Sequence, residues 1–246
     1  MEMSTTNHLK VYAAILAGGS GIRMGNPEKP KQYYALGSKP IMVHTVEKFI
    51  ATGLFEKIIV LCPEGWEQQT RDLLDRYCGA QSDLIDVLLG GATRADTVET
   101  AVGYMIERFD VDENTLIVTH DAVRPFVTHR IIKENIQEAA KHGACDTVIP
   151  ATDTIVKSVD GLTLCSIPDR SLFYQGQTPQ TFNLLKMKVL LDGLAASEKK
   201  GLTDACGIFT LRGEKVAMVR GEPTNIKITY PHDMRIASSL LGDPRV

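Results

Sequence analysis

The sequence predicts an α/β fold in which a mostly parallel sheet is flanked by helices. Short apolar segments of strand length alternate with longer segments whose apolar residues recur at helical spacing. Strands and helices that alternate at this rhythm form helical crossovers, which make neighbouring strands parallel. In addition, glycines follow the first apolar segment directly, which is typical of a loop that binds phosphate.

The first half of the chain contains repeated strand–helix units. Strands are expected at Val11–Leu16 and Lys57–Pro63, and the apolar run LIDVLL leads into a second glycine pair, Gly90-Gly91. Helices are expected at Pro40–Thr52, Glu67–Cys78 and Arg94–Phe109, the first of them with Pro40 at a favoured first-turn position.

The second half begins with the same alternation and then departs from it. We expect a strand at Thr115–Phe126 that ends in a polar cluster, a helix near Ile131–Lys141 and a strand at Asp146–Ala151. From Thr152 to about Phe182 two short β-type runs flank Asp160-Gly161, a strong hairpin signal. We therefore expect one domain over residues 1–246, with a β-arm inserted at about 152–180. Because an isolated two-stranded arm is marginal in water, we expect it to pack on a second subunit of a homodimer.

Composition and charge exclude several classes of protein. The net charge of -3 argues against a nucleic-acid surface, which normally carries a basic stripe. No apolar run reaches the roughly 18 residues of a membrane span. The opening MEMSTTNHLK lacks a signal-peptide core, so a cytoplasmic location is expected. The five cysteines are scattered and never spaced CxxC, which indicates reduced, mostly buried thiols.

The segment LAGGSGIRMGNPEKPKQ, residues 16–32, matches neither of two common phosphate-loop motifs. The nucleotide-hydrolase form needs Gly-Lys-Ser/Thr, which is absent, and the dinucleotide form GxGxxG fails because its third glycine comes one place late. What remains is a glycine turn followed by two cations, Arg23 and Lys31. Backbone N–H groups and these cations suit a triphosphate. From spacing alone, a tight turn with two solvated basic residues is an open alternative.

This segment resembles the nucleotide-binding signature of sugar-phosphate nucleotidyltransferases, LAGGxGxRMG followed by PKQ. Five further motifs resemble the cytidylyltransferase branch in the same order, over about residues 11–241: GGATRADTV, HDAVRP, QTPQTF, LTDA and NIKIT. The resemblance implies a Rossmann-like sheet with the site at the carboxyl ends of its strands. It also implies CTP as substrate, Mg²⁺ as cofactor and a polyol phosphate as acceptor.

The acceptor distinguishes two groups of relatives. The segments TDTIV, YQGQTPQTFN, LTDAC and GEPTNIKIT resemble ribitol-5-phosphate cytidylyltransferases of wall teichoic acid synthesis more than methylerythritol-phosphate cytidylyltransferases of isoprenoid synthesis. The implied reaction converts D-ribitol 5-phosphate and CTP to CDP-ribitol and pyrophosphate, and a reductase that supplies ribitol 5-phosphate is an expected partner. The alternatives are the methylerythritol-phosphate enzyme, a transferase for another polyol or sugar phosphate, and a non-catalytic nucleotide-binding protein.

The resemblance also implies roles for individual residues. Arg23 and Lys31 would be catalytic. The nucleotide would contact Leu16, Ala17, Gly18, Gly19, Ser20, Gly21, Gly90, Gly91, Ala92, Arg94, Thr97, Asp121 and Ala122. The acceptor phosphate would contact Thr154, Arg170, Thr178 and Lys227, the first two reaching the partner subunit's site from the arm.

Each of these roles has a structural alternative. Asp121 would bind the metal ion, but a carboxylate at a strand end is often a cap or turn residue. Thr97 also suits a helix cap, and Arg124 suits an ion pair as well as a phosphate. Thr224 stands where relatives often carry an acidic residue, so a second protein ligand for the metal ion is in doubt, and Glu222 is a weak substitute.

Overall fold

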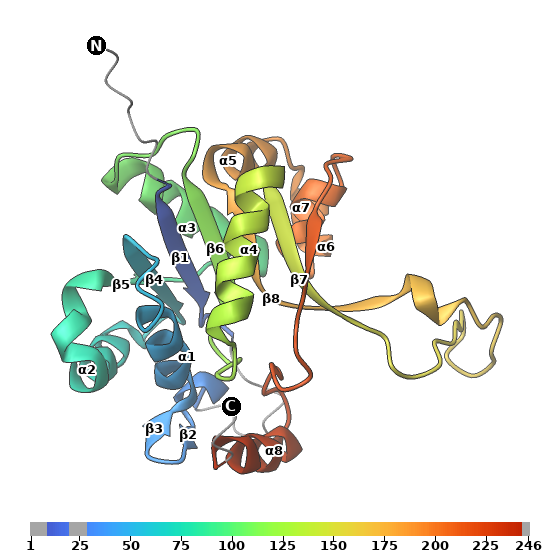
Figure 1. Cartoon of the computed structure of the whole chain (residues 1–246), viewed down its shortest axis with the longest axis horizontal. Helices are drawn as coiled ribbons and strands as arrows, with labels where there is room; N and C mark the ends of the chain where they lie inside the picture. The colour runs from blue at the N-terminus through green and yellow to red at the C-terminus, as the bar shows by residue number, and fades with distance from the viewer. Residues whose placement is uncertain (1–8, 20–28, 243–246) are drawn as a thin grey trace.

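A computed structural model describes residues 9–19 and 29–242 of the chain, and within them seven strands form one central sheet (Figure 1). The strand order across the sheet is β5-β4-β1-β6-β8-β7-β9. The strands are β1 (Val11–Leu16), β4 (Lys57–Cys62), β5 (Ile85–Leu89), β6 (Leu116–Asp121), β7 (Ala144–Pro150), β8 (Tyr174–Asn183) and β9 (Ala217–Arg220). The short strands β2 (Ala35–Leu36) and β3 (Lys39–Pro40) form a separate hairpin. The predicted α/β class is confirmed.

Strand direction determines where the site lies. Strands β5, β4, β1 and β6 are parallel neighbours, so their carboxyl ends meet at one edge of the sheet. Strand β8 runs antiparallel between β6 and β7, and β9 pairs parallel with β7. The sheet is therefore mostly parallel, with one reversed strand that the alternation of elements alone did not locate.

Helices cover both faces of the sheet. The helices are α1 (Ile41–Ile50), α2 (Glu67–Cys78), α3 (Arg94–Arg108), α4 (His129–His142), α5 (Leu184–Asp192), α6 (Ala196–Gly201), α7 (Cys206–Thr210) and α8 (Pro231–Leu241). Three 3-10 segments are also described: η2 (Lys31–Tyr33), η3 (Gly79–Leu84) and η4 (Arg170–Leu172). Helices α1, α2 and α4 share a core with Ala13 and Ile15 of β1, whereas α3, α5 and α7 share one with Tyr12 and Ala14. This alternation along β1 is what a strand buried on both faces requires.

Several element boundaries differ slightly from the expected ones. Helix α1 begins at Ile41, and Pro40 is its N-cap residue because the backbone of Pro40 pairs with Ala35 in the β2–β3 hairpin. Strand β6 ends at Asp121, and the polar cluster that follows forms a turn closed by a hydrogen bond from the N–H of Arg124 to the carbonyl of Asp121. No helix in the described part of the chain is long and apolar enough to span a bilayer.

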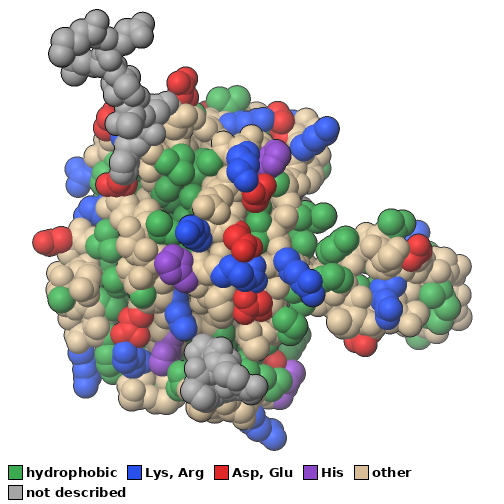
Figure 2. Space-filling model, in the orientation of Figure 1, with side chains coloured by type: hydrophobic (Ala, Val, Ile, Leu, Met, Phe, Trp, Pro, Cys, Tyr) green, Lys and Arg blue, Asp and Glu red, His purple; other side chains and the backbone are tan. Residues whose placement is uncertain are grey.

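The expected arm at about 152–180 corresponds to a shorter projecting segment between β7 and β8. It leaves the sheet after β7 and returns at β8, so it spans residues 151–173 and projects from the body (Figures 1 and 2). Residues 174–183 belong to the sheet because β8 pairs with β6 on one side and β7 on the other, which buries Gln177–Phe182.

The turn of the arm lies where the sequence predicted it. The Asp160 carboxylate accepts hydrogen bonds from the N–H groups of Leu162 and Thr163 at 2.9 and 2.8 Å. The two flanking runs, however, pair through one antiparallel bridge, Lys157–Ser166, instead of forming two regular strands.

Candidate functional site

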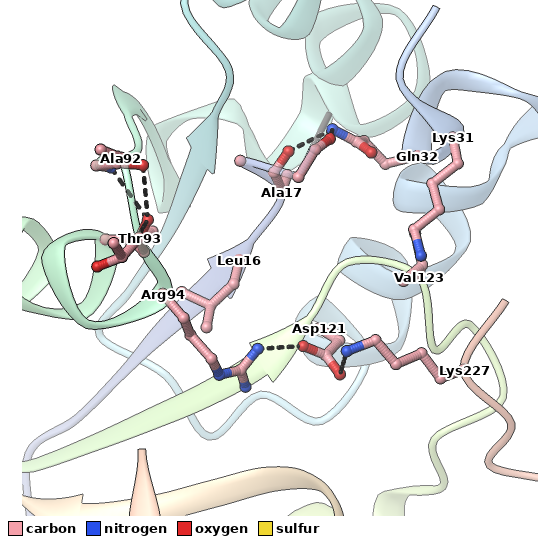
Figure 3. A pocket seen from close by; sticks show the side chains of 14 residues that line it. Leu16, Ala17, Lys31, Gln32, Ala92, Thr93, Arg94, Asp121, Val123 and Lys227 are labelled. Carbon is pink, nitrogen blue, oxygen red and sulfur yellow. Dashed lines mark hydrogen bonds and ion pairs between the residues drawn. The ribbon is translucent and has the colours of Figure 1, made fainter. Parts of the chain in front are cut away.

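A pocket of about 550 Å³ opens at the sheet edge where the parallel strands end (Figure 3). It is bounded by the loop after β1, the η2 turn, the start of α3, the end of β6 and the segment before α8. The lining residues are Leu16, Ala17, Gly18, Gly19, Lys31, Gln32, Gly91, Ala92, Thr93, Arg94, Thr97, Asp121, Val123 and Lys227. The structure therefore brings together residues from every predicted nucleotide motif at a single opening.

The first glycine loop is anchored at both sides of the pocket. Ala17 donates its N–H to the carbonyl of Leu61 in β4 at 2.8 Å. The side-chain amide of Gln32 donates to the carbonyls of Ala17 and, at 3.1 Å, Gly19. Sequence reasoning missed Gln32 as a lining residue, although it closes the PKQ motif. The predicted residues Ser20, Gly21 and Arg23 lie outside the described residues.

The second glycine pair packs tightly against the start of α3. The N–H of Gly91 donates to Thr97 Oγ1 at 3.0 Å, and that hydroxyl donates to the carbonyl of Thr93 at 2.8 Å. A Cβ at Gly91 would lie 2.3 Å from Cβ of Asp96, so a side chain there would require the helix to move. Gly90 donates its N–H to the Cys62 carbonyl at 2.8 Å and does not line the pocket.

The N-cap of α3 is Thr93, not Thr97. Thr93 and Asp96 form a reciprocal capping box, in which Thr93 Oγ1 accepts from the N–H of Asp96 and the Asp96 carboxylate accepts from the N–H of Thr93. The spacing Thr-x-x-Asp was the available signal for this cap. Thr97 instead fixes the glycine loop from within the first turn of the helix.

Asp121 stands at the end of β6 among three cations. Its Oδ1 accepts from Nη1 of Arg94 at 2.6 Å, and its Oδ2 lies 3.2 Å from Nε of Arg124 and 3.1 Å from Nζ of Lys227 (Figure 3). Burial by itself would raise the pKa of this carboxyl, but the charges of Arg94, Lys227 and Arg124 hold the pKa well below its usual range. Asp121 is therefore ionised, and both of its oxygens have partners.

One of the cations around Asp121 has a nitrogen that forms no hydrogen bond with the described residues. Nε of Arg94 is buried and has no hydrogen-bond partner within the described part of the chain. Lys31, which is 8% exposed, also lines the pocket, and in Figure 3 its side chain runs toward Val123. Among the described lining residues, one carboxylate, Asp121, accompanies three cations, Lys31, Arg94 and Lys227, so this part of the lining is cationic and suits a phosphorylated ligand.

His120 and Thr178 lie beneath Asp121. Burial lowers the pKa of His120 to about 3, so its imidazole is neutral. The carbonyl of Arg124 can only accept, so Nε2 of His120 donates to it at 3.2 Å and Nδ1 accepts from the Thr178 hydroxyl at 2.9 Å. Thr178 Oγ1 in turn accepts from the N–H of Asp121 at 3.1 Å. In this arrangement Thr178 cannot donate to a phosphate.

The other predicted acceptor residues occupy different places. Lys227 lines the pocket, whereas Thr154 and Arg170 are exposed on the arm and do not line it. Nη1 of Arg170 donates to the carbonyl of Thr152 at 2.6 Å. Ala122 is also outside the pocket lining, because it is buried with its N–H bonded to the Leu16 carbonyl and its own carbonyl bonded to Thr45.

The described residues fit a metal ion that arrives with its substrate. They contain no cluster of three or more His, Cys, Asp or Glu side chains that would hold a metal by themselves. Asp121 is an ionised carboxylate at the pocket wall, and Mg²⁺ is commonly held by one or two carboxylates together with substrate phosphates. An ion at Asp121 would share Oδ1 with Arg94, or Oδ2 with Arg124 and Lys227.

Comparison with known proteins gives the family. Residues 11–243 match the model of the IspD family, 2-C-methyl-D-erythritol 4-phosphate cytidylyltransferase. The chain belongs to this family. The resemblance expected from the sequence motifs is thereby confirmed.

Two relatives show how far this family likeness extends. The chain is 44% identical, over 94% of its own length and 98% of the relative's, to a protein of Lactiplantibacillus plantarum named ribitol-5-phosphate cytidylyltransferase. Among solved structures of the family, 4-diphosphocytidyl-2C-methyl-D-erythritol synthase from Anaerococcus prevotii superposes with a TM-score of 0.79 at 27% identity, covering 95% of this chain and 96% of that one.

A third relative has the same fold at similar distance. The 2-C-methyl-D-erythritol 4-phosphate cytidylyltransferase of Francisella tularensis has a TM-score of 0.76 and 26% identity, covering 94% of this chain and 99% of that chain. The family fold thus accounts for nearly the whole chain, including the segment that carries Asp121.

Replacing Asp121 with asparagine should lower the free energy of unfolding by about 2 kcal/mol at pH 7, because the cations around it lose a buried partner. The depressed pKa means that this stabilisation is present above about pH 4, the unfolded value, and is lost as pH falls further. Urea unfolding at pH 7 and pH 3.5 should show a wild-type advantage that shrinks in acid.

The matched control for this prediction is Asp192→Asn. Asp192 pairs with Lys188 on an exposed face of α5, so its loss should change the stability by less than about 0.5 kcal/mol. A wild-type advantage over Asp121→Asn that stays constant from pH 7 to pH 3.5 would contradict the assigned charge state.

Proposed function

We propose that this protein transfers the cytidylyl group of CTP to D-ribitol 5-phosphate, forming CDP-ribitol and pyrophosphate. The proposal rests on a pocket that is lined by Lys31, Arg94 and Lys227 in a member of a cytidylyltransferase family. The acceptor is taken from the relative at 44% identity, which is named ribitol-5-phosphate cytidylyltransferase. We extend it to wall teichoic acid synthesis, because the motifs around β8 and Asn225 resemble those of the ribitol-phosphate enzymes.

The proposed chemistry needs no covalent enzyme intermediate. An oxygen of the acceptor phosphate attacks the α-phosphorus of CTP in line, a new P–O bond forms, and the bond to the departing pyrophosphate breaks. A phosphate monoester is already anionic at pH 7, so no general base is required. Catalysis then depends on positioning and on stabilising negative charge.

The cations of the pocket supply that stabilisation in our proposal. Lys31 on η2 lines the pocket and would stabilise charge on the α-phosphate and the leaving pyrophosphate. The sequence motif assigns the same role to Arg23, which lies outside the described residues. Arg94 has a buried Nε with no hydrogen-bond partner among the described residues, and its guanidinium can move from Asp121 to a phosphate. Bound Mg²⁺ would supply further charge neutralisation between the phosphates, with Asp121 as its protein ligand.

The two glycine loops hold the nucleotide in this proposal. Leu16–Gly19 and Gly91-Ala92 line the pocket with backbone groups and mostly small side chains. Close approach of a ligand to backbone N–H and carbonyl groups is what such loops permit. The hydrogen bond between Gly91 and Thr97 fixes the second loop before a ligand arrives.

The acceptor site is completed by a second subunit in our proposal. The arm exposes a row of large apolar side chains, among them Val159 at 87% and Leu162 at 90% exposure, which is unfavourable in water unless another surface covers them. Arg170 and Thr154 lie on the same arm and outside their own pocket. A homodimer in which each arm reaches the partner's pocket would bring Arg170 toward Lys227 of the partner subunit.

Methylerythritol 4-phosphate is the second candidate acceptor, because the family model and the solved structures carry its name. Pyrophosphate release with CTP and Mg²⁺ should be measured with each acceptor at equal concentration. We expect a strong preference for D-ribitol 5-phosphate. Preference for methylerythritol 4-phosphate would overturn the acceptor assignment, and no release with either would overturn the proposed reaction.

Lys31→Ala should lower kcat by roughly 10²–10³-fold at saturating CTP, because a cation that stabilises the transition state is lost. The measurement is steady-state pyrophosphate release. Lys29→Ala is the control, since Lys29 lies two residues away and does not line the pocket. Near-full turnover of Lys31→Ala would contradict its catalytic role.

Mixing two inactive variants tests whether the arm acts on its partner. Arg170→Ala and Lys31→Ala should each be impaired, but a refolded mixture should regain about a quarter of wild-type activity, because heterodimers contain one intact site. Activity of mixed and unmixed samples gives the answer. A mixture no better than its components would show that Arg170 acts within its own chain.

A further inference from the structure

We infer that Gln177 and Asn225, two buried side-chain amides, are positioning residues that hold Lys227 in the pocket. This inference rests on the proposed function, in which Lys227 binds the acceptor phosphate. Lys227 is carried by an irregular segment, residues 221–230, between β9 and α8. Its placement therefore has to come from contacts with the sheet.

Gln177 supplies the first of these contacts by acting as a strand partner. Its Nε2 donates to the carbonyl of Glu222 at 2.9 Å, and its Oε1 accepts from the N–H of Glu222 at 3.3 Å. The side chain thus satisfies both backbone groups of one residue, as a neighbouring strand would. Gln177 is 6% exposed, and its own backbone belongs to β8.

Asn225 connects the same segment to two further elements. Its Nδ2 donates to Gln177 Oε1 at 3.1 Å and to the carbonyl of Thr178 at 2.9 Å. Its backbone carbonyl accepts from Nη1 of Arg124 at 2.8 Å. Asn225 is fully buried, so loss of its side chain would remove one hydrogen bond from Gln177 Oε1 and one from the carbonyl of Thr178, and no water would replace them.

These contacts lead directly to the pocket. Two residues after Asn225, Nζ of Lys227 lies 3.1 Å from Oδ2 of Asp121, and the next residue, Ile228, donates its N–H to the carbonyl of Val123 at 3.0 Å. The segment is consequently tied to β8 on one side and to the turn after β6 on the other. Loss of either amide would loosen Lys227 while leaving the glycine loops in place.

Gly221 gives a second way to disturb the contact between Gln177 and Glu222. A Cβ at Gly221 would lie 2.3 Å from Oε1 of Gln177 and 3.0 Å from Cγ2 of Thr147. Because the side-chain oxygen of Gln177 is the closer and more movable obstacle, Gly221→Ala should push the amide away from Glu222. A glycine here is required by the space that Gln177 occupies.

The first experiment measures kinetics of Gln177→Met and Asn225→Leu with CTP, Mg²⁺ and D-ribitol 5-phosphate. We expect KM for the acceptor to rise about 10-fold and KM for CTP to change less than about 2-fold, since one unsatisfied buried group costs enough for such a change. The control is Asn135→Leu, which removes a fully buried amide bonded to Thr147 and Thr181, away from the pocket lining. It should lower Tm without raising KM for the acceptor.

The second experiment uses Gly221→Ala in two backgrounds. In the wild type it should raise KM for the acceptor as Gln177→Met does. In Gln177→Ala its added effect should be much smaller, because the obstructing oxygen is gone and only the 3.0 Å contact with Cγ2 of Thr147 remains. Equal effects of Gly221→Ala in both backgrounds would overturn the inference. So would equal rises in KM for CTP and for the acceptor, or an Asn135→Leu variant that matches Gln177→Met.

Hydrogen exchange separates this inference from the proposed function. Backbone amides of residues 222–228 should exchange faster in Gln177→Met and Gly221→Ala than in wild type and Asn135→Leu, whether or not any variant is active. Unchanged exchange would overturn the inference. Absence of wild-type turnover with accelerated exchange in the variants would instead overturn the acceptor assignment and leave the positioning role of Gln177 standing.

Discussion

The arrangement of the site depends on the ionised carboxylate of Asp121. It is buried at the end of a central strand, where an unpaired charge would be strongly unfavourable, and Arg94, Arg124 and Lys227 compensate it from three separate segments. Each of these cations is thereby drawn to one point. The same attraction holds together, in one pocket, the groups to which we assign the binding of a nucleotide and a phosphorylated acceptor.

The sheet supplies the geometry for this convergence. Parallel β1, β4, β5 and β6 end at one edge, so the loops that follow β1, β5 and β6 share a pocket. The reversed strand β8 then brings Thr178 under Asp121 and Gln177 beside Glu222. His120 lies beside Thr178. Because full burial keeps its imidazole neutral, its Nδ1 can accept a hydrogen bond from the Thr178 hydroxyl.

The arm has a different physical character from the rest of the chain. The body buries its large apolar side chains in cores on both faces of the sheet, whereas residues 151–173 leave Val159, Leu162 and Leu172 largely exposed. Asp160 stabilises the turn of the arm through local hydrogen bonds. The two runs that flank the turn are joined by one antiparallel bridge, Lys157–Ser166. Packing against another surface would bury more apolar area of the arm than pairing of its own two runs does, which is the basis for the proposed homodimer.

The sequence by itself determined the α/β class, most strand and helix positions, the position of the Asp160-Gly161 turn and the family motifs, because apolar periodicity and glycine placement are local properties. It did not place β8, since the pairing of residues 174–183 with β6 and β7 is a long-range choice made by burial. It placed Thr154 and Arg170 on the arm, but it did not give the 3.1 Å separation between Nζ of Lys227 and Oδ2 of Asp121. Only the tertiary structure decided those distances, and with them the role of Gln177, whose partners Glu222 and Asn225 lie more than forty residues away in sequence.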